Sequence, residues 1–137
     1  MKAPGKWTIP GLFKGRPGSM RLFRIVRRYV GSLGPVRVEA AKTQVSFGAT
    51  RNFTWVWLPQ MYSKKRPENS ITVTFDLPKR IKDRRIAQSV VPRPGRWTHH
   101  VVIEKPADFD AKVRGWLRKA YAFGQIDGRK KKVARKA

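Results

Sequence analysis

The stretch that decides the fold is ITVTFDL at residues 71–77, in which apolar and polar side chains alternate without a break. Successive side chains of a strand point to opposite faces, so this period of two predicts a strand with one apolar face. The same alternation recurs in other segments on both sides of it, which we also interpret as strands. They are residues 36–39, 44–47, 53–58 and 97–104, with a further short strand expected within 86–91.

Before these strands the period changes to that of a helix, over about residues 20–33. At 100° per residue the apolar side chains fall on one arc and four arginines on the opposite arc, which is typical of a surface helix. We expect Ser19 to be its N-cap and Gly34-Pro35 to end it. The arginines are Arg21, Arg24, Arg27 and Arg28.

A second helix is predicted at the other end of the strand region, over about residues 107–123 after Pro106. Asp108 and Asp110 in its first turn suit a helix N-terminus, and we interpret them as capping groups rather than a catalytic pair. Gly124 fits the position that follows a helix. Apolar residues recur along one stripe of this segment, so it has a face to bury.

Helix, strands and helix in this order predict an α+β domain. We expect an antiparallel sheet of about five strands with the N-terminal and the C-terminal helix packed on one face. The expected domain covers residues 19–124. A basic arm rich in Gly and Pro precedes it at residues 1–18, and a basic disordered tail follows at residues 125–137.

The composition excludes several classes of protein. With no cysteine among its 137 residues, the chain has no disulfide, thiolate metal site or cysteine nucleophile. No apolar run approaches the ~20 residues of a membrane span, and residues 1–6 do not resemble a secretory signal. Hydrophobic residues make up 40% of the chain, which favours a packed core over a disordered basic protein. We expect a cytoplasmic monomer or dimer.

The charge indicates the class of partner. The formal net charge is +24, and only a small part of it lies in the C-terminal tail. So many like charges repel one another, and a bound polyanion would reduce this repulsion. Nucleic acid, DNA or RNA, is the expected partner, bound through phosphates with little sequence specificity. An anionic membrane surface, an acidic protein partner and a simple solubility trait are the alternatives that charge alone leaves open.

Twelve cations are the candidate nucleic-acid-binding residues. They come from the first helix, from the loops at residues 62–66 and 79–96, and from a turn between two strands. The tail cations from Arg129 to Lys132 would add non-specific affinity. The twelve are Arg21, Arg24, Arg27, Arg28, Arg51, Lys64, Lys65, Arg66, Arg84, Arg85, Arg93 and Arg96.

The strand with Phe53, Trp55 and Trp57 has two interpretations. Aromatic side chains on a sheet beside basic loops could stack on bases. They could equally line the core beneath the helices, and we take the core as the default.

A different function class is a small-molecule or peptide-binding module, with a pocket between sheet and helices lined by Trp55, His100 and Tyr121.

Nothing in the sequence forms a catalytic constellation, so we expect no enzyme activity, no cofactor and no metal site. His99 and His100 are neighbours on a predicted strand, so their side chains point to opposite faces and cannot easily share a metal ion. One of them is expected to face the core and to be satisfied by a hydrogen bond. The eight acidic residues do not cluster as a two-metal site would need.

Three stretches of the chain resemble a known family. They are KTQVSF at 42–47 leading to RNFTWV at 51–56, WTHHVVI at 97–103, and VRGWLRKAY at 113–121. Over about residues 22–123 the chain resembles a small bacterial family catalogued as domain of unknown function 5655. The resemblance implies a single α+β domain without an established activity, found alone or attached to other domains, some of them nuclease-like. It implies no catalytic residues.

Overall fold

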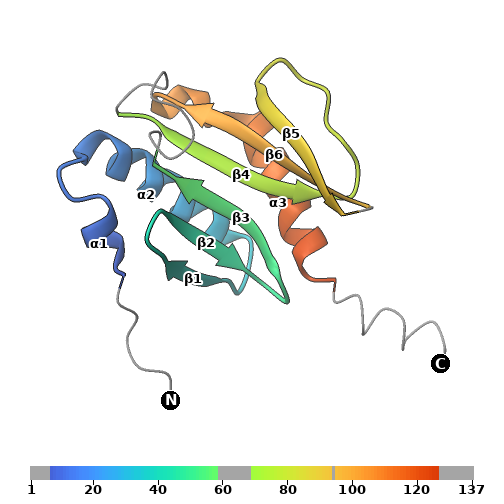
Figure 1. Ribbon diagram of the computed structural model, residues 1–137, viewed down its shortest axis with the longest axis horizontal. Coiled ribbons are helices and arrows are strands. Elements are labelled where there is room, and N and C mark those ends of the chain that lie inside the picture. Colours follow the sequence, from blue (N-terminus) through green and yellow to red (C-terminus); the bar gives the residue numbers. More distant parts are fainter. Residues whose placement is uncertain (1–6, 59–68, 94, 127–137) are drawn as a thin grey trace.

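A computed structural model describes residues 7–58, 69–93 and 95–126 as an antiparallel sheet with two longer helices on one of its faces (Figure 1). The predicted α+β class is confirmed, although the sheet has six strands rather than about five. The helices are α1 (Ile9–Leu12), α2 (Pro17–Ser32), the 3₁₀ turn η2 (Pro106–Asp108) and α3 (Ala111–Gly124). The strands are β1 (Arg37–Ala40), β2 (Gln44–Gly48), β3 (Asn52–Trp57), β4 (Ile71–Leu77), β5 (Ile86–Arg93) and β6 (Arg96–Ile103).

The strand order across the sheet is β1-β2-β3-β4-β6-β5. The first four strands form a meander. The hairpin of β5 and β6 then joins β4 through β6, so β1 and β5 are the two edges. In Figure 1, α2 and α3 lie behind the sheet and the other face of the sheet is turned toward the viewer. We call these the helix side and the open face.

The helix side contains the core. Phe47 of β2 packs on Phe23 of α2 with ring centroids 6.1 Å apart, and Phe75 of β4 stacks on Trp116 of α3 at 5.8 Å. Apolar residues at alternate positions of the central strands complete the layer. The strand that the alternation predicted most clearly, β4, is therefore the centre of the fold.

The first long helix begins earlier than its sequence suggested. Pro17 is its first residue and Arg16 its N-cap, so the prediction of Ser19 as N-cap was wrong. Proline suits the first helical turn because its missing N–H would have had no partner there. Ser19 is instead fully buried, and its hydroxyl donates to the Ser70 carbonyl at 2.8 Å, which ties α2 to the start of β4.

The C-terminal helix is split where one helix was predicted. Pro106 opens the 3₁₀ turn η2, and α3 begins only after Asp110, whose carboxylate caps it by accepting from the Val113 N–H at 3.1 Å. Asp108 caps the preceding turn by accepting from the backbone N–H groups of Glu104 and Lys105. Both aspartates are capping groups, as predicted.

The aromatic strand β3 corrects a second expectation. Phe53 is fully buried and packs edge-on against Tyr121 of α3, with centroids 5.4 Å apart. Trp55 and Trp57, however, pair with Thr74 and Thr72 of β4, on the open face. The cause is an irregularity beside Phe53, where Asn52 pairs with Gly48 but Thr54 already pairs with Phe47. The extra residue lets Phe53 reach the core while both indoles lie outside it.

Candidate nucleic-acid interface

Four exposed arginines form the outer side of α2. The residues that α2 buries against the sheet are apolar apart from Ser19, and the exposed residues Arg21, Arg24, Arg27 and Arg28 lie away from them. The helix contains no acidic residue. Because an i, i+3, i+4 spacing gathers side chains on one side of a helix, the four guanidinium groups share one outer face.

Helix α3 extends this charge. Arg114, Arg118 and Lys119 are exposed, while the opposite stripe of the helix is buried. The two helices meet where the Tyr29 hydroxyl of α2 donates to the Arg114 carbonyl at 3.0 Å. We call the seven exposed cations the basic helix surface. They are Arg21, Arg24, Arg27, Arg28, Arg114, Arg118 and Lys119.

Three acidic side chains of the described chain form ion pairs with cations outside the basic helix surface. Asp83 pairs with Lys112 at 2.9 Å, Asp110 with Arg85 at 2.9 Å, and Asp76 with Arg96 at 2.6 Å. A backbone N–H bond from Val113 holds the pKa of Asp110 below its usual value, and one from Arg85 does the same for the pKa of Asp83. Within the described ranges, no salt bridge reaches the basic helix surface.

Two of the predicted phosphate ligands, Arg85 and Arg96, form ion pairs within the fold. Arg85 donates from Nη2 to the Asp108 carbonyl at 2.6 Å besides its ion pair with Asp110, so it clamps the segment before β5 to the start of α3. Arg96 donates from Nε to the buried carboxylate of Asp76, whose other oxygen accepts from the Thr98 hydroxyl at 2.7 Å.

The other predicted cations divide into three cases. Arg51 donates from Nη2 to the Phe123 carbonyl at 3.2 Å, and its guanidinium lies 4.2 Å from the centroid of that ring. It thus fastens the turn between β2 and β3 to the end of α3. Arg84 is exposed, and Arg93 ends β5 opposite Arg96. Lys64, Lys65 and Arg66, like the tail residues from Arg129 to Lys132, lie outside the described residues.

The three residues of the predicted pocket are not brought together. Trp55 and His100 share the open face, because both are in register with Thr74 of β4. His100 is buried there, and its Nδ1 lies 2.7 Å from the Thr74 hydroxyl oxygen. Tyr121 belongs to α3, on the helix side of the sheet.

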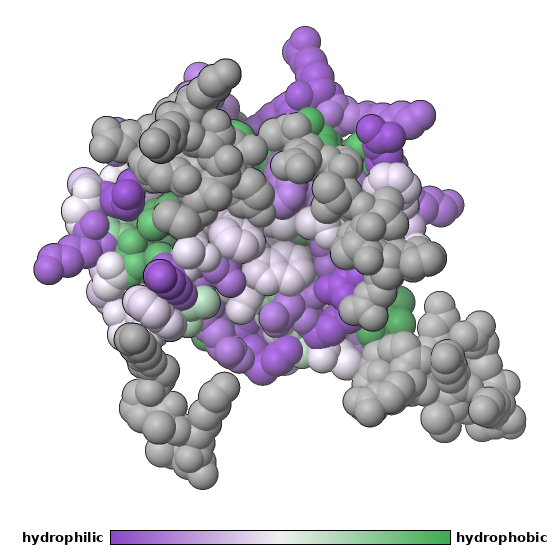
Figure 2. All heavy atoms as spheres, in the orientation of Figure 1, coloured by the Kyte–Doolittle hydropathy of each residue, from purple (hydrophilic) through white to green (hydrophobic). Residues whose placement is uncertain are grey.

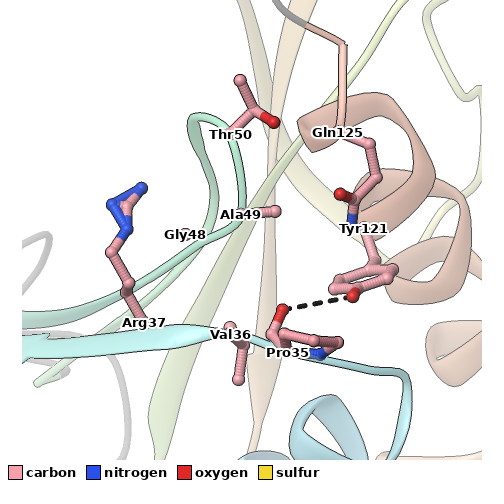
Figure 3. Close-up of a pocket in the computed structure, with 8 residues that line it drawn as sticks. All are labelled: Pro35, Val36, Arg37, Gly48, Ala49, Thr50, Tyr121 and Gln125. Atoms are coloured by element: carbon pink, nitrogen blue, oxygen red, sulfur yellow. Dashed lines mark hydrogen bonds between the residues drawn. The ribbon is translucent and has the colours of Figure 1, made fainter.

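Tyr121 lines a separate surface pocket of about 380 Å³ between the start of β1, the β2–β3 turn and the end of α3. Figure 3 shows its hydroxyl turned toward the Pro35 carbonyl, to which it donates at 3.1 Å. Arg37 and Gln125 lie at opposite sides of the view. The lining otherwise consists of small and backbone groups, so the pocket offers few side chains for orienting a ligand.

His99 is the core-facing histidine of the pair. Its ring is fully buried and stacks on Phe75, with centroids 5.1 Å apart. Its Nε2 accepts the Ile81 backbone N–H at 2.9 Å, which requires that nitrogen to be unprotonated. Burial lowers the pKa of His99, and nearby backbone carbonyls of Phe75 and Trp97 only partly oppose this. The ring is therefore a neutral structural group.

Neither a metal site nor a membrane-spanning helix is visible in the part of the chain that the structure describes. No group of three or more His, Cys, Asp or Glu side chains there could hold a metal ion. No described helix is long and apolar enough to cross a bilayer.

The cations of α3 are the residues that the sequence analysis missed. Positively charged side chains near the C-terminal end of a helix interact favourably with the helix dipole. Arg118 and Lys119 therefore have a structural explanation from the sequence alone. The missing signal was available: Arg114 and Arg118 are four residues apart, on the side of the helix away from the apolar stripe. Only the structure shows that α3, with these cations exposed, packs beside α2.

Comparison with known proteins yields one match. The family model described as "Domain of unknown function (DUF5655)" matches residues 11–124, which include both long helices and the whole sheet. No curated protein and no solved structure matches the chain.

Proposed function

The chain belongs to the family described as "Domain of unknown function (DUF5655)", and from this premise we propose that it binds nucleic acid through phosphate contacts of its basic helix surface. The family description assigns no activity, so the surface chemistry of this chain supports the proposal. The observation that carries the proposal is the outer sides of α2 and α3, two helices in contact, which bear seven exposed cations and contain no acidic residue.

Repulsion between these like charges lowers the stability of the fold unless a partner of opposite charge binds to them. Like charges at i, i+3 and i, i+4 repel each other by a few tenths of a kcal/mol per pair. The ion pairs of the described chain are formed by other cations, Arg85, Arg96 and Lys112, and none of them reaches this face. A polyanion that lies along the two helices would supply the missing counter-charge.

The chemistry of the surface favours phosphate. Six of its seven members are arginines, whose planar guanidinium donates two parallel hydrogen bonds to phosphate oxygens. Phosphate contacts position a protein on a nucleic acid without reading its bases. We therefore expect similar affinities for sequences of the same length and strandedness.

The decisive experiment is a fluorescence-anisotropy titration of labelled oligonucleotides with the full chain. The test variant changes Arg21, Arg24, Arg27 and Arg28 to Gln. The matched control changes four exposed lysines outside the basic helix surface to Gln, which removes the same net charge. These lysines are Lys14, Lys42, Lys79 and Lys82.

We expect the arginine variant to bind more than about tenfold more weakly at low salt, because four counterion-releasing contacts are lost. The control should lose no more than about threefold, since it changes only the long-range field. Equal losses in both variants would show that no defined surface is involved. If the protein bound vesicles of anionic lipid but not oligonucleotides, the partner of this surface would be a membrane and not a nucleic acid.

A further inference from the structure

The open face of the sheet presents two tryptophans that the core does not use. Trp55 and Trp57 are partly exposed and lie two residues apart on β3, so their indoles share this face. The helices of the described chain pack on the opposite side (Figure 1). Large aromatic side chains contribute most stability when they are buried, so a partly exposed Trp55 outside the helix-covered core is a candidate for binding.

Hydrogen-bonding side chains surround the tryptophans. Ser46 of β2 and Thr74 of β4 are opposite Trp55, and His100 is opposite Thr74. The bond between His100 and Thr74 fixes the floor beside the indole. Figure 2 shows this face, with residues of near-neutral hydropathy at its centre and both hydrophilic residues and smaller hydrophobic patches toward its rim. An aromatic centre with a polar surround differs from the apolar patch that a protein partner would prefer.

The spacing suits unpaired bases. Alternate residues of a strand are about 6.6 Å apart, a distance at which two rings can each receive one base of a strand whose bases are splayed. One class of RNA-binding domain uses aromatic side chains on its sheet in this way and stacks two or three bases on them. A duplex offers its bases only as edges within the grooves, so this face would not engage one.

We infer that the open face binds an unpaired stretch of nucleic acid, with bases stacked on Trp55 and Trp57. This inference rests on the proposed function, because the net charge of +24 is what makes a nucleic acid the complementary occupant. It adds a substrate class: the basic helix surface accepts any phosphate backbone, and the open face gives a preference for single strands.

The test compares a 12-nucleotide oligo-dT with a duplex of 12 base pairs, both bound to the full chain. Trp55→Ala removes the stacking ring, and Trp55→Phe keeps an aromatic ring in its place. Trp7→Ala is the matched control, because Trp7 is an exposed tryptophan of the N-terminal segment. Far-UV circular dichroism and thermal melting establish that each variant is folded.

We expect Trp55→Ala to weaken oligo-dT binding about five- to 150-fold, the loss of one stacked base, and to leave duplex binding within about twofold. Trp55→Phe should recover most of the affinity, and Trp7→Ala should match the wild type. Tryptophan emission should fall when oligo-dT binds, and this quenching should shrink when Trp55 is replaced by Phe.

Two results would overturn the inference: undiminished oligo-dT binding by folded Trp55→Ala, or equal losses for oligo-dT and duplex. Neither result would contradict the proposed function, which is tested by the variant with Arg21, Arg24, Arg27 and Arg28 changed to Gln. If that variant binds both oligonucleotides like the wild type, the helix surface is wrong, whatever the tryptophans do. A wild-type chain that binds neither oligonucleotide at low salt refutes both.

Discussion

His99 and His100 are adjacent residues with opposite surroundings. His99 faces the helix side, stacked on Phe75, and His100 faces the open face, bonded to Thr74. The alternation of a strand determines this division, and it was predictable from the sequence. The partners were not, because Ile81 and Thr74 come from segments whose position relative to β6 depends on the whole sheet.

We predict that His99 makes the fold sensitive to mild acid. Burial lowers the pKa of His99 below the 6.5 of an unperturbed histidine. The unfolded chain therefore takes up the proton first. The stability that the neutral ring contributes is complete above pH 6.5 and is lost as the pH falls toward the pKa of the folded state. Protonation of Nε2 would also break the bond from the Ile81 N–H.

Urea unfolding at pH 7.5 and pH 5.5 measures this effect, with His99→Gln as the comparison. Glutamine stays neutral at both pH values and retains an acceptor for the Ile81 N–H. The wild type should lose more free energy of unfolding between the two pH values than the variant does. Asp76 and Arg80, the charged neighbours of His99, remain in both proteins, so equal losses would assign the acid sensitivity to other groups.

At the scale of elements, the end of α3 is fixed closely to the turn before β3. The Gly124 carbonyl accepts from the Arg51 N–H at 3.0 Å, and the Phe123 carbonyl accepts from the Arg51 side chain. Gly124 is buried directly against Phe53, and a Cβ there would lie 2.8–2.9 Å from the ring and the Cβ of Phe53. The glycine permits the contact between helix and strand.

This contact predicts opposite effects for two helical glycines. Gly124→Ala should destabilise the protein by about 1–3 kcal/mol, because Phe53 is fully buried and has little room to move. Gly31→Ala, at an exposed position of α2 with no atom within 4 Å of the added methyl, should stabilise it by about 0.5–1 kcal/mol. Thermal and urea unfolding of the two variants give the comparison, and a neutral Gly124→Ala would show that α3 can shift on the sheet.

The elements also show where sequence reasoning stops. Periodicity predicted α2, β4 and β6 because each shows its pattern over several residues. It assigned Trp55 and Trp57 to the core by default, because a strict period of two cannot reveal an extra residue beside Phe53. The start of α2 was misplaced for a related reason. Ser19 has the side chain of an N-cap, but its hydroxyl bonds to Ser70, 51 residues away in the chain.

At the scale of the molecule, the sequence predicted the fold class and the charge but not their arrangement. Composition predicted a polyanionic partner without showing which cations remain available. Only the packed structure separates Arg85 and Arg96, which neutralise buried or capping carboxylates, from the arginines of α2. Likewise, only the sheet register shows that Trp55 and Tyr121 lie on different sides. Long-range pairing decides both questions, and local patterns do not encode it.

The salt dependence of binding is a property of the whole molecule and provides the last prediction. The logarithm of duplex affinity should fall linearly with the logarithm of salt concentration, by about 0.9 for each phosphate that the protein neutralises. Replacing Arg21, Arg24, Arg27 and Arg28 by Gln should make this slope shallower by roughly 3 to 4. The variant with four substituted lysines should keep the wild-type slope, because those residues are not expected to contact phosphate.

Anisotropy titrations of one duplex at four or more salt concentrations yield the three slopes. For oligo-dT the change should be smaller, about 0.7 per contact, because a single strand condenses fewer counterions. The contribution of Trp55 to oligo-dT binding should persist at high salt, since stacking releases no ions. If the arginine and lysine variants changed the slope equally, the +24 charge would act as a diffuse field, and α2 would have no special role.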